Sequence, residues 1–202
     1  MTDLEYFLAT YGLNEGQVTF VPYGSRVYGT NNANSDYDYM AIVPSNRRAD
    51  TGTEFRHGET NIHIYNLIDF QSQLDLHKIH ALEAYFMPEG EVAKIFWFTL
   101  DLPKLRCSLS EKSSNSWVKA KKKIEVEKDY YIGWKSLFHS LRILNFGIQI
   151  ARDGKITDYG AQNQTWFDIL AAQQYNWGYF KEKYQSEYNR LGSEFKKLAP
   201  KE

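Results

Sequence analysis

The first half of the chain contains three stretches in which hydrophobic and polar residues alternate, and this spacing predicts β-strands. They read "QVTFVPYG", "YDYMAIVP" and "GTEFRHGETNIHIYN". The third stretch predicts a hairpin that turns near His57-Gly58. Ahead of the strands, Thr2 and Glu5 have the spacing of a capping box, which predicts a helix over residues 3–11 that ends at Gly12.

After the strands, hydrophobic residues recur at helical spacing from Asp69 to Met87. This periodicity predicts a helix whose core face consists of Phe70, Leu74, Ile79, Leu82 and Phe86. The stretch "AKIFWFTL" that follows predicts one more strand.

The character of the sequence changes near residue 108, where "SLSEKSSNS" is polar and typical of a loop. Beyond it the pattern predicts helices at about residues 114–127, 129–152, 163–175 and 177–198. Strands in the first half and helices in the second predict an α+β fold, with a mixed-sheet lobe at residues 1–108 and a helical lobe at residues 109–202.

Composition narrows the class of protein. The 202 residues are 43% hydrophobic, enough for one sizeable core or two small lobes. The 24 basic and 25 acidic side chains leave a formal charge of −1, which argues mildly against a partner that is an extended nucleic acid. The single Cys107 fits a reducing cytoplasm, and neither a signal peptide nor a membrane span is expected.

Candidate chemistry is concentrated in "VPYGSRVYGTNNANSDYDYM", residues 21–40. Asp36 and Asp38 are two residues apart, so on an extended strand their side chains point to the same face. Two such carboxylates repel each other unless a cation such as Mg²⁺ lies between them. Gly24 allows close approach of the backbone to a ligand, and Ser25 would present amide and hydroxyl groups to a phosphate. These groups are the parts of a phosphoryl or nucleotidyl transfer site.

Taken singly, an Asp-x-Asp pair or a Gly-Ser turn is usually only a solvated or structural feature. The order and spacing of the pieces between two apolar strands carry the prediction. Gly24-Ser25-Arg26, Gly29-Thr30 and Ser35-Asp36-x-Asp38 followed by apolar residues resemble the signature of the DNA polymerase β-like nucleotidyltransferases. The likeness is closest to the small stand-alone branch of bacteria and phages, and it is strong over residues 18–44.

This resemblance implies that Asp36 and Asp38 bind Mg²⁺, or Mn²⁺, and that Gly24 and Ser25 hold phosphates of a nucleoside triphosphate. A nucleoside monophosphate would then pass to a hydroxyl group, with release of pyrophosphate. The acceptor would be a protein side chain, an RNA end or a small molecule such as an aminoglycoside. The nucleotide is expected in a cleft between the two lobes.

Basic residues are further candidates for contact with the phosphates. Arg26 is equally compatible with a phosphate contact and with a solvated or paired guanidinium. The resemblance implies a lysine from the helical lobe at the triphosphate, and Lys135 and Arg142, seven residues apart, loosely match that arrangement. Ordinary surface pairing is the equal alternative.

The same resemblance implies a third metal-binding carboxylate on the strand "GETNIHIYN", where the chain departs from the family pattern. The expected place is nearest Asn61 or His63, and neither is an acid. Glu59 is the one acid on that face, and it lies close to the turn. The alternative function is therefore a nucleotide-binding or partner-binding module that has lost catalysis.

Other residues favour structural roles. Lys119 with Lys122 or Lys123 would share one side of a helix, but a solvated helix is the preferred interpretation. His139 is expected to pack, Glu83 is expected on a helix face, and His77 with His80 lack the further ligands of a zinc site. A core role is also preferred to base stacking for the aromatic set Tyr175, Trp177, Tyr179, Phe180 and Tyr184.

Overall fold

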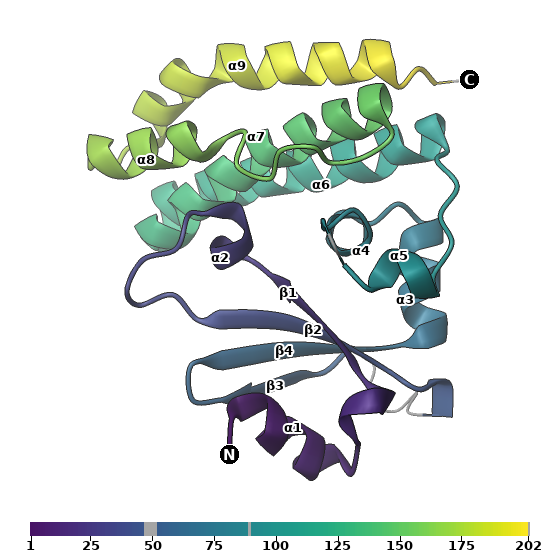
Figure 1. The fold of residues 1–202 in the computed structure, drawn as a ribbon. Coiled ribbons are helices and arrows are strands. Elements are labelled where there is room, and N and C mark those ends of the chain that lie inside the picture. The colour runs from purple at the N-terminus through teal and green to yellow at the C-terminus, as the bar shows by residue number, and fades with distance from the viewer. Residues whose placement is uncertain (47–51, 89, 202) are drawn as a thin grey trace. The chain divides into compact units, whose positions relative to one another are not determined.

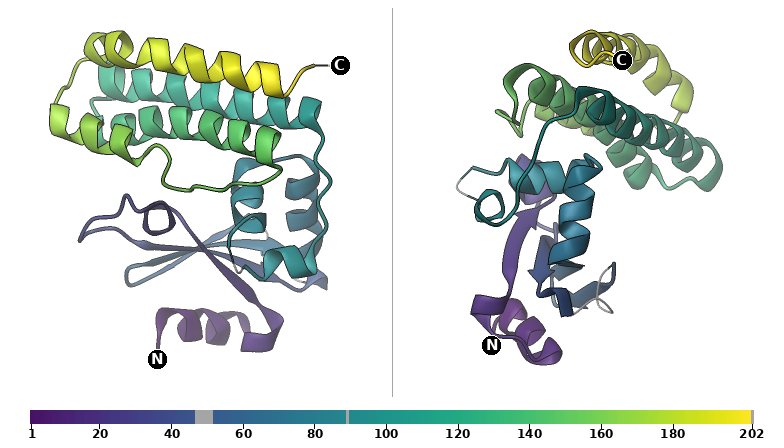
Figure 2. Two further views of the ribbon diagram at one scale, coloured as in Figure 1. Left: turned by 45° about the horizontal axis from the view of Figure 1, so that its top comes forward. Right: turned by 90° about the vertical axis from the view of Figure 1, so that its right-hand side faces the viewer.

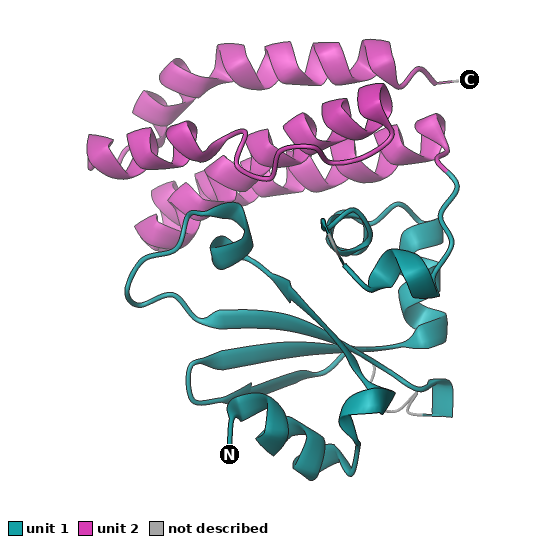
Figure 3. Cartoon of the chain, viewed as in Figure 1, with its two compact units in different colours: residues 1–99 teal, residues 100–202 magenta. Residues whose placement is uncertain are grey.

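The computed structural model describes residues 1–46, 52–88 and 90–201 (Figure 1). The chain divides into two compact units, residues 1–99 and residues 100–202 (Figure 3). The first contains a mixed sheet and short helices, and the second is helical. The predicted α+β class, with a sheet lobe followed by helices, is thus confirmed.

The sheet of the first unit has the order β1-β2-β4-β3. β2 pairs antiparallel with β1 and parallel with β4, and β3 pairs antiparallel with β4. The predicted hairpin is present, because β3 and β4 are joined by the two residues Gly58 and Glu59. The strands are β1 (Thr19–Tyr23), β2 (Tyr37–Val43), β3 (Glu54–His57) and β4 (Thr60–Asn66).

Helix α1 (Asp3–Tyr11) begins and ends where the sequence predicts. Thr2 and Glu5 form the capping box, and Gly12 ends the helix at φ 60°. The helix is followed by the short 3₁₀ turn η1 (Glu15–Gln17). The apolar side of α1 covers one face of the sheet and forms a core with the inward residues of β2 and β4 (Figure 1). That core contains Phe7, Leu8, Leu13, Ala41, Val43, Ile62 and Ile64.

A polar cluster also fastens α1 to the hairpin. Asp3 accepts a hydrogen bond from the Thr60 hydroxyl at 2.7 Å, and its other oxygen lies 2.8 Å from His57 Nδ1. The His57 ring stacks on Tyr6 with centroids 4.0 Å apart. The hydrogen bond from Thr60 and, next, that with His57 lower the pKa of Asp3 below its ordinary value of 3.8.

The opposite sheet face is covered at one end by α3 (Leu67–Asp75) and α4 (Ile79–Tyr85). The single helix predicted over residues 69–87 is wrong, because the chain breaks at His77, whose φ is 52°. His77 N donates to the Leu74 carbonyl and Lys78 N to the Gln73 carbonyl, a Schellman-type end that usually has glycine. The predicted core residues Phe70, Leu74, Ile79 and Leu82 are buried, whereas Phe86 is only partly buried.

The strand predicted for "AKIFWFTL" is also wrong. Its first part lies in α5 (Val92–Ile95), and residues 96–100 are in neither a helix nor a strand. Phe96 packs on Phe70 with centroids 4.9 Å apart, and Trp97 is 71% exposed. This segment pairs with no strand of the described chain, and a short apolar run does not reveal in the sequence whether a pairing strand is present.

The second unit is built on three long helices that run side by side (Figure 2). α7 packs against α6, α8 and α9. Lys123–Glu127 form a π-helical turn, η3, between α6 and α7. The helices are α6 (Leu102–Lys122), α7 (Tyr130–Asp153), α8 (Asn163–Ala172) and α9 (Trp177–Leu198).

The loop predicted for "SLSEKSSNS" is wrong, because these residues lie inside α6. The lobe boundary expected at residue 108 also lies inside α6, whereas the two units divide between residues 99 and 100. Asp101 caps α6 by accepting from Lys104 N at 2.9 Å. The buried face of α6 includes Ser113, whose hydroxyl donates to the Ser140 carbonyl of α7 at 2.8 Å. A serine that faces a neighbouring helix looks the same in the sequence as a serine in a loop.

The aromatic set near α9 divides between core and surface. Trp177, Phe180 and Tyr184 are buried, as predicted for core residues, whereas Tyr175 and Tyr179 are exposed. Close packing of α9 on α7 requires a glycine at residue 147, where a Cβ atom would lie 2.8 Å from the Phe195 ring. In the described part of the chain, no helix combines the length and the apolar character needed to cross a membrane.

The lowered pKa of Asp3 gives a testable pH dependence of stability. The hydrogen bonds to the carboxylate stabilise the fold above the ordinary pKa of 3.8, and this contribution disappears as the pH falls through the lowered pKa. We expect Asp3→Asn to lower the unfolding temperature at pH 7 and to lose less stability than wild type between pH 5 and pH 2. Thermal unfolding followed by circular dichroism measures both effects, and parallel losses for the two proteins would contradict the assignment.

Candidate functional site

The turn between β1 and α2 (Ser25–Tyr28) is the first part of the candidate site. Gly24 has φ 82° and ψ −159°, a conformation open essentially to glycine alone. Its carbonyl accepts from the amides of Val27 and Tyr28 at 3.1 and 3.2 Å. The amides of Ser25 and Arg26 begin the helix and have no acceptor within it. The turn therefore presents backbone donors where the sequence predicts phosphates.

Asp38 lies directly against this turn. It is the partner of Tyr23, the last residue of β1, in the β1–β2 register. A Cβ atom added to Gly24 would collide with Asp38 Oδ2. Gly24 is thus required twice, for its backbone conformation and for the space that the Asp38 carboxylate occupies. The glycine turn and the carboxylate, which were predicted to lie close together, are in contact within the first unit.

The carboxylate also affects the neighbouring tyrosine. Burial, and then the negative charge of Asp38, raise the pKa of the Tyr23 hydroxyl. The hydroxyl therefore stays protonated throughout the physiological range and keeps its capacity to donate. Tyr23 also packs near His63, with ring centroids 5.7 Å apart.

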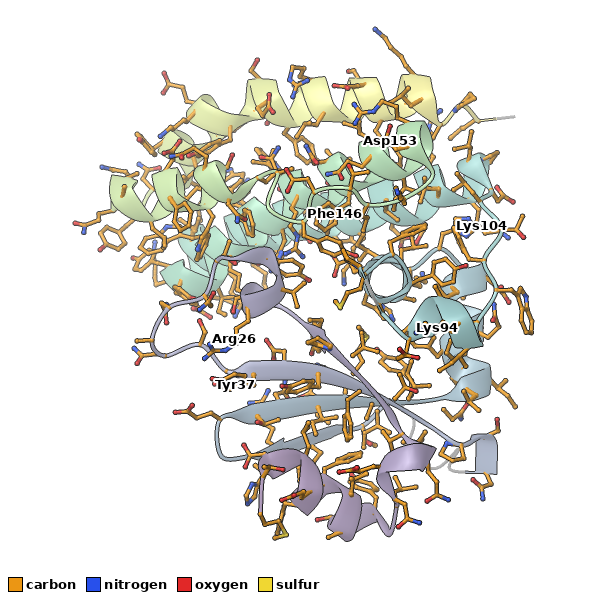
Figure 4. All side chains as sticks on the ribbon, in the orientation of Figure 1. Arg26, Tyr37, Lys94, Lys104, Phe146 and Asp153 are labelled. Atoms are coloured by element: carbon orange, nitrogen blue, oxygen red, sulfur yellow. The ribbon has the colours of Figure 1, made fainter. Side chains whose placement is uncertain are left out.

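Asp36 lies one residue before β2 and is exposed. Arg26 fixes the backbone here, because its guanidinium donates to the Ser35 carbonyl at 2.7 Å and to the Asp36 carbonyl at 3.3 Å. The guanidinium also lies 3.8 Å from the centre of the Tyr37 ring (Figure 4). Arg26 therefore orders the loop that carries Asp36, and a direct phosphate contact stays a prediction.

The loop before Asp36 is held by its own polar side chains. Asn32 Oδ1 accepts from the amide of Asn34 at 2.8 Å, and the amide of Asn32 donates to the Ser35 hydroxyl at 2.9 Å. These local bonds explain why the run between Gly29 and Asp36 is made mostly of small polar residues. The run forms a compact turn that delivers the chain to β2.

The place opposite Asp38 on β4 is filled by Asn61. The two residues are partners in the parallel register, and Asn61 Nδ2 donates to Asp38 Oδ1 at 3.4 Å. Asn61 Oδ1 is buried and accepts no hydrogen bond from the described residues. Of the two residues predicted for the third ligand position, Asn61 is the one that faces Asp38.

His63 lies two register positions further along β4 than Asn61, where its partner is Met40. That displacement is about 6–7 Å along the strand. Its Nδ1 atom lies 3.5 Å from a carboxylate oxygen of Glu54 on β3. Glu59 belongs to the hairpin turn and accepts from Tyr37 N through its carbonyl at 2.8 Å. His63 and Glu59 are thus both less well placed than Asn61 for a ligand shared with Asp38.

The sequence missed one residue that supports the turn, Glu83 of α4. A helix-face role was preferred for Glu83 to a contribution to the site, but it is only 5% exposed and accepts a hydrogen bond from the Tyr28 hydroxyl at 2.7 Å. Tyr28, itself 5% exposed, is the last residue of α2. This bond anchors α2, and with it the Gly24-Ser25 turn, to α4. The signal in the sequence is a lone acid within the apolar run "HALEAYF".

Lys135 and Arg142 lie in the second unit, two turns apart on α7. Arg142 is 4% exposed, and its guanidinium lies 5.5 Å from the Phe138 ring centre and 5.3 Å from that of Phe146. Both residues lie close enough to His139 for their positive charges to lower its pKa. The predicted shared face of Lys135 and Arg142 is therefore present within this unit.

A divalent metal ion near Asp38 would need several side-chain donors around it. Within residues 1–46, 52–88 and 90–201, no three His, Cys, Asp or Glu side chains gather as a metal site requires. The oxygen donors are instead the carboxylates of Asp36 and Asp38 and the amide of Asn61, whose buried Oδ1 is unsatisfied within the described chain. Hard oxygen donors of this kind fit Mg²⁺, with fewer charges than three carboxylates would supply.

Comparison with known proteins adds no identity to this geometry. No protein-family model matches the chain, and no curated protein matches its sequence. The arrangement of Gly24, Asp38 and Asn61 is therefore the basis on which a function is proposed.

Gly24→Ala tests the contact between turn and carboxylate. The alanine must adopt a conformation that costs about 1–3 kcal/mol, and its methyl group displaces the Asp38 carboxylate. We expect a loss of stability of at least this size and a weakening of Mg²⁺–nucleotide binding by about tenfold or more, since about 1.4 kcal/mol is a factor of ten. Chemical denaturation and calorimetry measure the two effects.

Gly16→Ala is the matched control, because Gly16 has no positive φ and no atom within 4 Å of an added Cβ. It should leave nucleotide binding unchanged. Equal affinity of Gly24→Ala and Gly16→Ala for the Mg²⁺–nucleotide complex would show that Gly24 is not part of the ligand site.

Proposed function

We propose that the protein is a Mg²⁺-dependent nucleotidyltransferase that moves a nucleoside monophosphate from a nucleoside triphosphate to an acceptor hydroxyl. The observation that carries the proposal is the Asp38 carboxylate, held against the Gly24-Ser25 turn by the β1–β2 register. A turn rich in amide donors beside a carboxylate provides for both halves of a metal–phosphate ligand.

In this proposal the residues of the first unit have separate roles. The amides after Gly24 and the Ser25 hydroxyl hold phosphate oxygens, Asp36 and Asp38 hold the metal, and Arg26 keeps Asp36 in place through the loop carbonyls. The bound metal would neutralise charge that develops on the α-phosphate and on the departing pyrophosphate. Lys135 and Arg142 of the second unit are proposed contacts of the triphosphate. Mn²⁺ would serve in place of Mg²⁺.

The reaction forms a bond between the acceptor oxygen and the α-phosphorus and breaks the bond from the α-phosphorus to the bridging oxygen. Pyrophosphate leaves with the bonding electron pair, and the hydroxyl proton passes to a base or to water. Asn61 has no basic oxygen to take that proton. Where a carboxylate performs this task, general base catalysis typically contributes about 10²–10⁴-fold, so slow turnover is part of the proposal.

The acceptor is proposed as a protein side chain, an RNA end or a small molecule, and a cytoplasmic location is part of the same proposal. The free thiol of Cys107 is compatible with a reducing compartment.

A second function, a nucleotide-binding or partner-binding module without catalysis, is favoured by one observation. Asn61 occupies the register position opposite Asp38, where a carboxylate would complete the metal site. An uncharged amide can still accept a metal contact through its oxygen but cannot act as a base. Binding of nucleotide is common to both functions, and turnover separates them.

The first experiment measures release of labelled pyrophosphate from each of the four nucleoside triphosphates, with Mg²⁺ and a cell lysate as the source of acceptors. The wild type should release pyrophosphate and Asp38→Ala should fall to background, since the metal-binding carboxylate is gone. Glu91→Ala is the control, because this acid lies before α5 and pairs with Lys94 at 2.7 Å. Nucleotide binding without any release, in wild type and Asp38→Ala alike, would favour the module.

Asn61→Asp tests whether the absence of a third carboxylate limits metal binding and turnover at the site. Without metal, a second negative charge about 3–4 Å from Asp38 should destabilise the fold by about 1–4 kcal/mol. With Mg²⁺ the variant should regain stability, bind the metal more tightly than wild type and turn over faster.

Asn34→Asp adds the same charge in the exposed loop and is the matched control. It should change neither the metal affinity nor the rate. Equal Mg²⁺ affinity of Asn61→Asp and wild type, measured by thermal shift against metal concentration, would contradict the assignment of Asn61 to a ligand position.

A further inference from the structure

His63 and Glu54 form a pair on the sheet face that carries Asp38. His63 is two residues after Asn61 on β4, so its side chain lies on the same face as those of Asn61 and Asp38. Glu54 of β3 is the register partner of His63, and one of its carboxylate oxygens lies 3.5 Å from His63 Nδ1. A histidine with a carboxylate at one ring nitrogen is thus present beside the candidate site.

The Glu54 carboxylate decides which nitrogen of the imidazole is basic. Its negative charge favours the tautomer that carries the proton on Nδ1, the nitrogen close to it. Nε2 then has a free lone pair. Among the residues that the structure describes, none forms a hydrogen bond with His63 Nε2. The His63 side chain is 33% exposed, so a ligand can approach the ring.

Tyr23 connects this pair to Asp38. Its ring centroid lies 5.7 Å from that of His63 on β4, although Tyr23 is the register partner of Asp38 and belongs to β1, on the other side of β2. The carboxylates of Asp38 and Glu54 both interact electrostatically with Tyr23. The tyrosine therefore reaches across β2, and the Glu54–His63 pair and the Asp38 carboxylate lie around a single side chain.

The distance along β4 suits a base that does not touch a metal ion at Asp38. Residues two apart on a strand are about 6–7 Å apart. A Mg²⁺–oxygen bond of about 2.1 Å, followed by a hydrogen bond of about 2.8 Å, reaches about 5 Å. An imidazole one such step along the strand can therefore form a hydrogen bond with an oxygen atom bound near Asp38, while Asn61 occupies the nearer place.

We propose that His63, oriented by Glu54, is the general base of the proposed nucleotidyl transfer. Nε2 accepts the proton of the acceptor hydroxyl while the hydroxyl oxygen forms its bond to the α-phosphorus, and pyrophosphate leaves with the electron pair of the bond that breaks. The imidazolium then gives the proton to solvent. This inference rests on the proposed function and names the base that Asn61 cannot be. Glu54 is a positioning residue, because it acts through the imidazole.

The first test measures pyrophosphate release and nucleotide binding in the same full-length variants. His63→Gln keeps a polar side chain but removes the basic nitrogen. With a cell lysate as the source of acceptors, it should release pyrophosphate at least about 100-fold more slowly than the wild type. Calorimetry with Mg²⁺ and a nucleoside triphosphate should give an unchanged affinity. His57→Gln is the matched control, because His57 pairs with Asp3 on the α1 side of the sheet, and it should release pyrophosphate as the wild type does.

Imidazole added to the solution separates a catalytic role from a structural one. His63→Ala leaves room at the position of the ring, and free imidazole should restore part of its pyrophosphate release. Asp38→Ala should gain nothing from imidazole, because it lacks the metal-binding carboxylate and not the base.

Nitrogen-15 spectra of the imidazole give a readout that needs no turnover. In the wild type the His63 resonances, assigned with His63→Gln, should show the proton on Nδ1. Glu54→Gln should shift the balance towards a proton on Nε2 and slow the transfer, which a purely structural role of Glu54 would not do. Glu91→Gln removes an acid that pairs with Lys94, and it should leave the His63 resonances unchanged.

The outcomes separate this inference from the proposed function. No pyrophosphate release by the wild type with any nucleotide would overturn the proposed function, and the base with it. Release by the wild type that His63→Gln keeps in full would overturn the base alone. So would a parallel loss of release and of Mg²⁺–nucleotide affinity in His63→Gln, since His63 would then be a ligand or a structural residue. A wild-type imidazole with its proton on Nε2 would also overturn the base.

Discussion

The candidate site in the first unit depends on the close packing of the Asp38 carboxylate against Gly24, which has no side chain. Gly24 leaves the space into which the Asp38 carboxylate fits, and its backbone takes a conformation that other residues avoid. The pairing of β1 with β2 brings the two together. Other features of the site follow from this contact, because Arg26 orders the loop that leads into β2 and Glu83 anchors the helix that leaves the turn.

The two faces of the sheet differ in that one packs on α1 and the other carries Asp38 and Asn61. One face packs Ile62, Ile64 and Val43 against α1 and forms the core. On the other face Asp38 and Asn61 are register partners at the ends of β2 and β4 where the strands begin. This second face is also buried farther along β2, where Met40 and Ile42 are each 2% exposed.

The second unit also depends on small residues at close contacts. Small residues at Ser113, Gly133 and Gly147 let the long helices approach closely, which leaves the outer positions of α6 and α7 free for charge. Acids compensate Lys121, Lys122 and Lys123 at the end of α6. Burial, and then the nearby cations of both helices, lower the pKa of His139 in this unit.

The sequence alone determined what local chemistry controls: the capped helix α1, the four strands, the hairpin turn and the neighbourhood of Gly24 and Asp38. It failed where long-range packing decides. The break at His77, the helical state of the serine-rich stretch and the unpaired residues 96–100 each depend on neighbours distant in the chain. Only the register of β2 with β4 distinguished Asn61 from His63, since alternation puts both on one face and cannot say which one lies opposite Asp38.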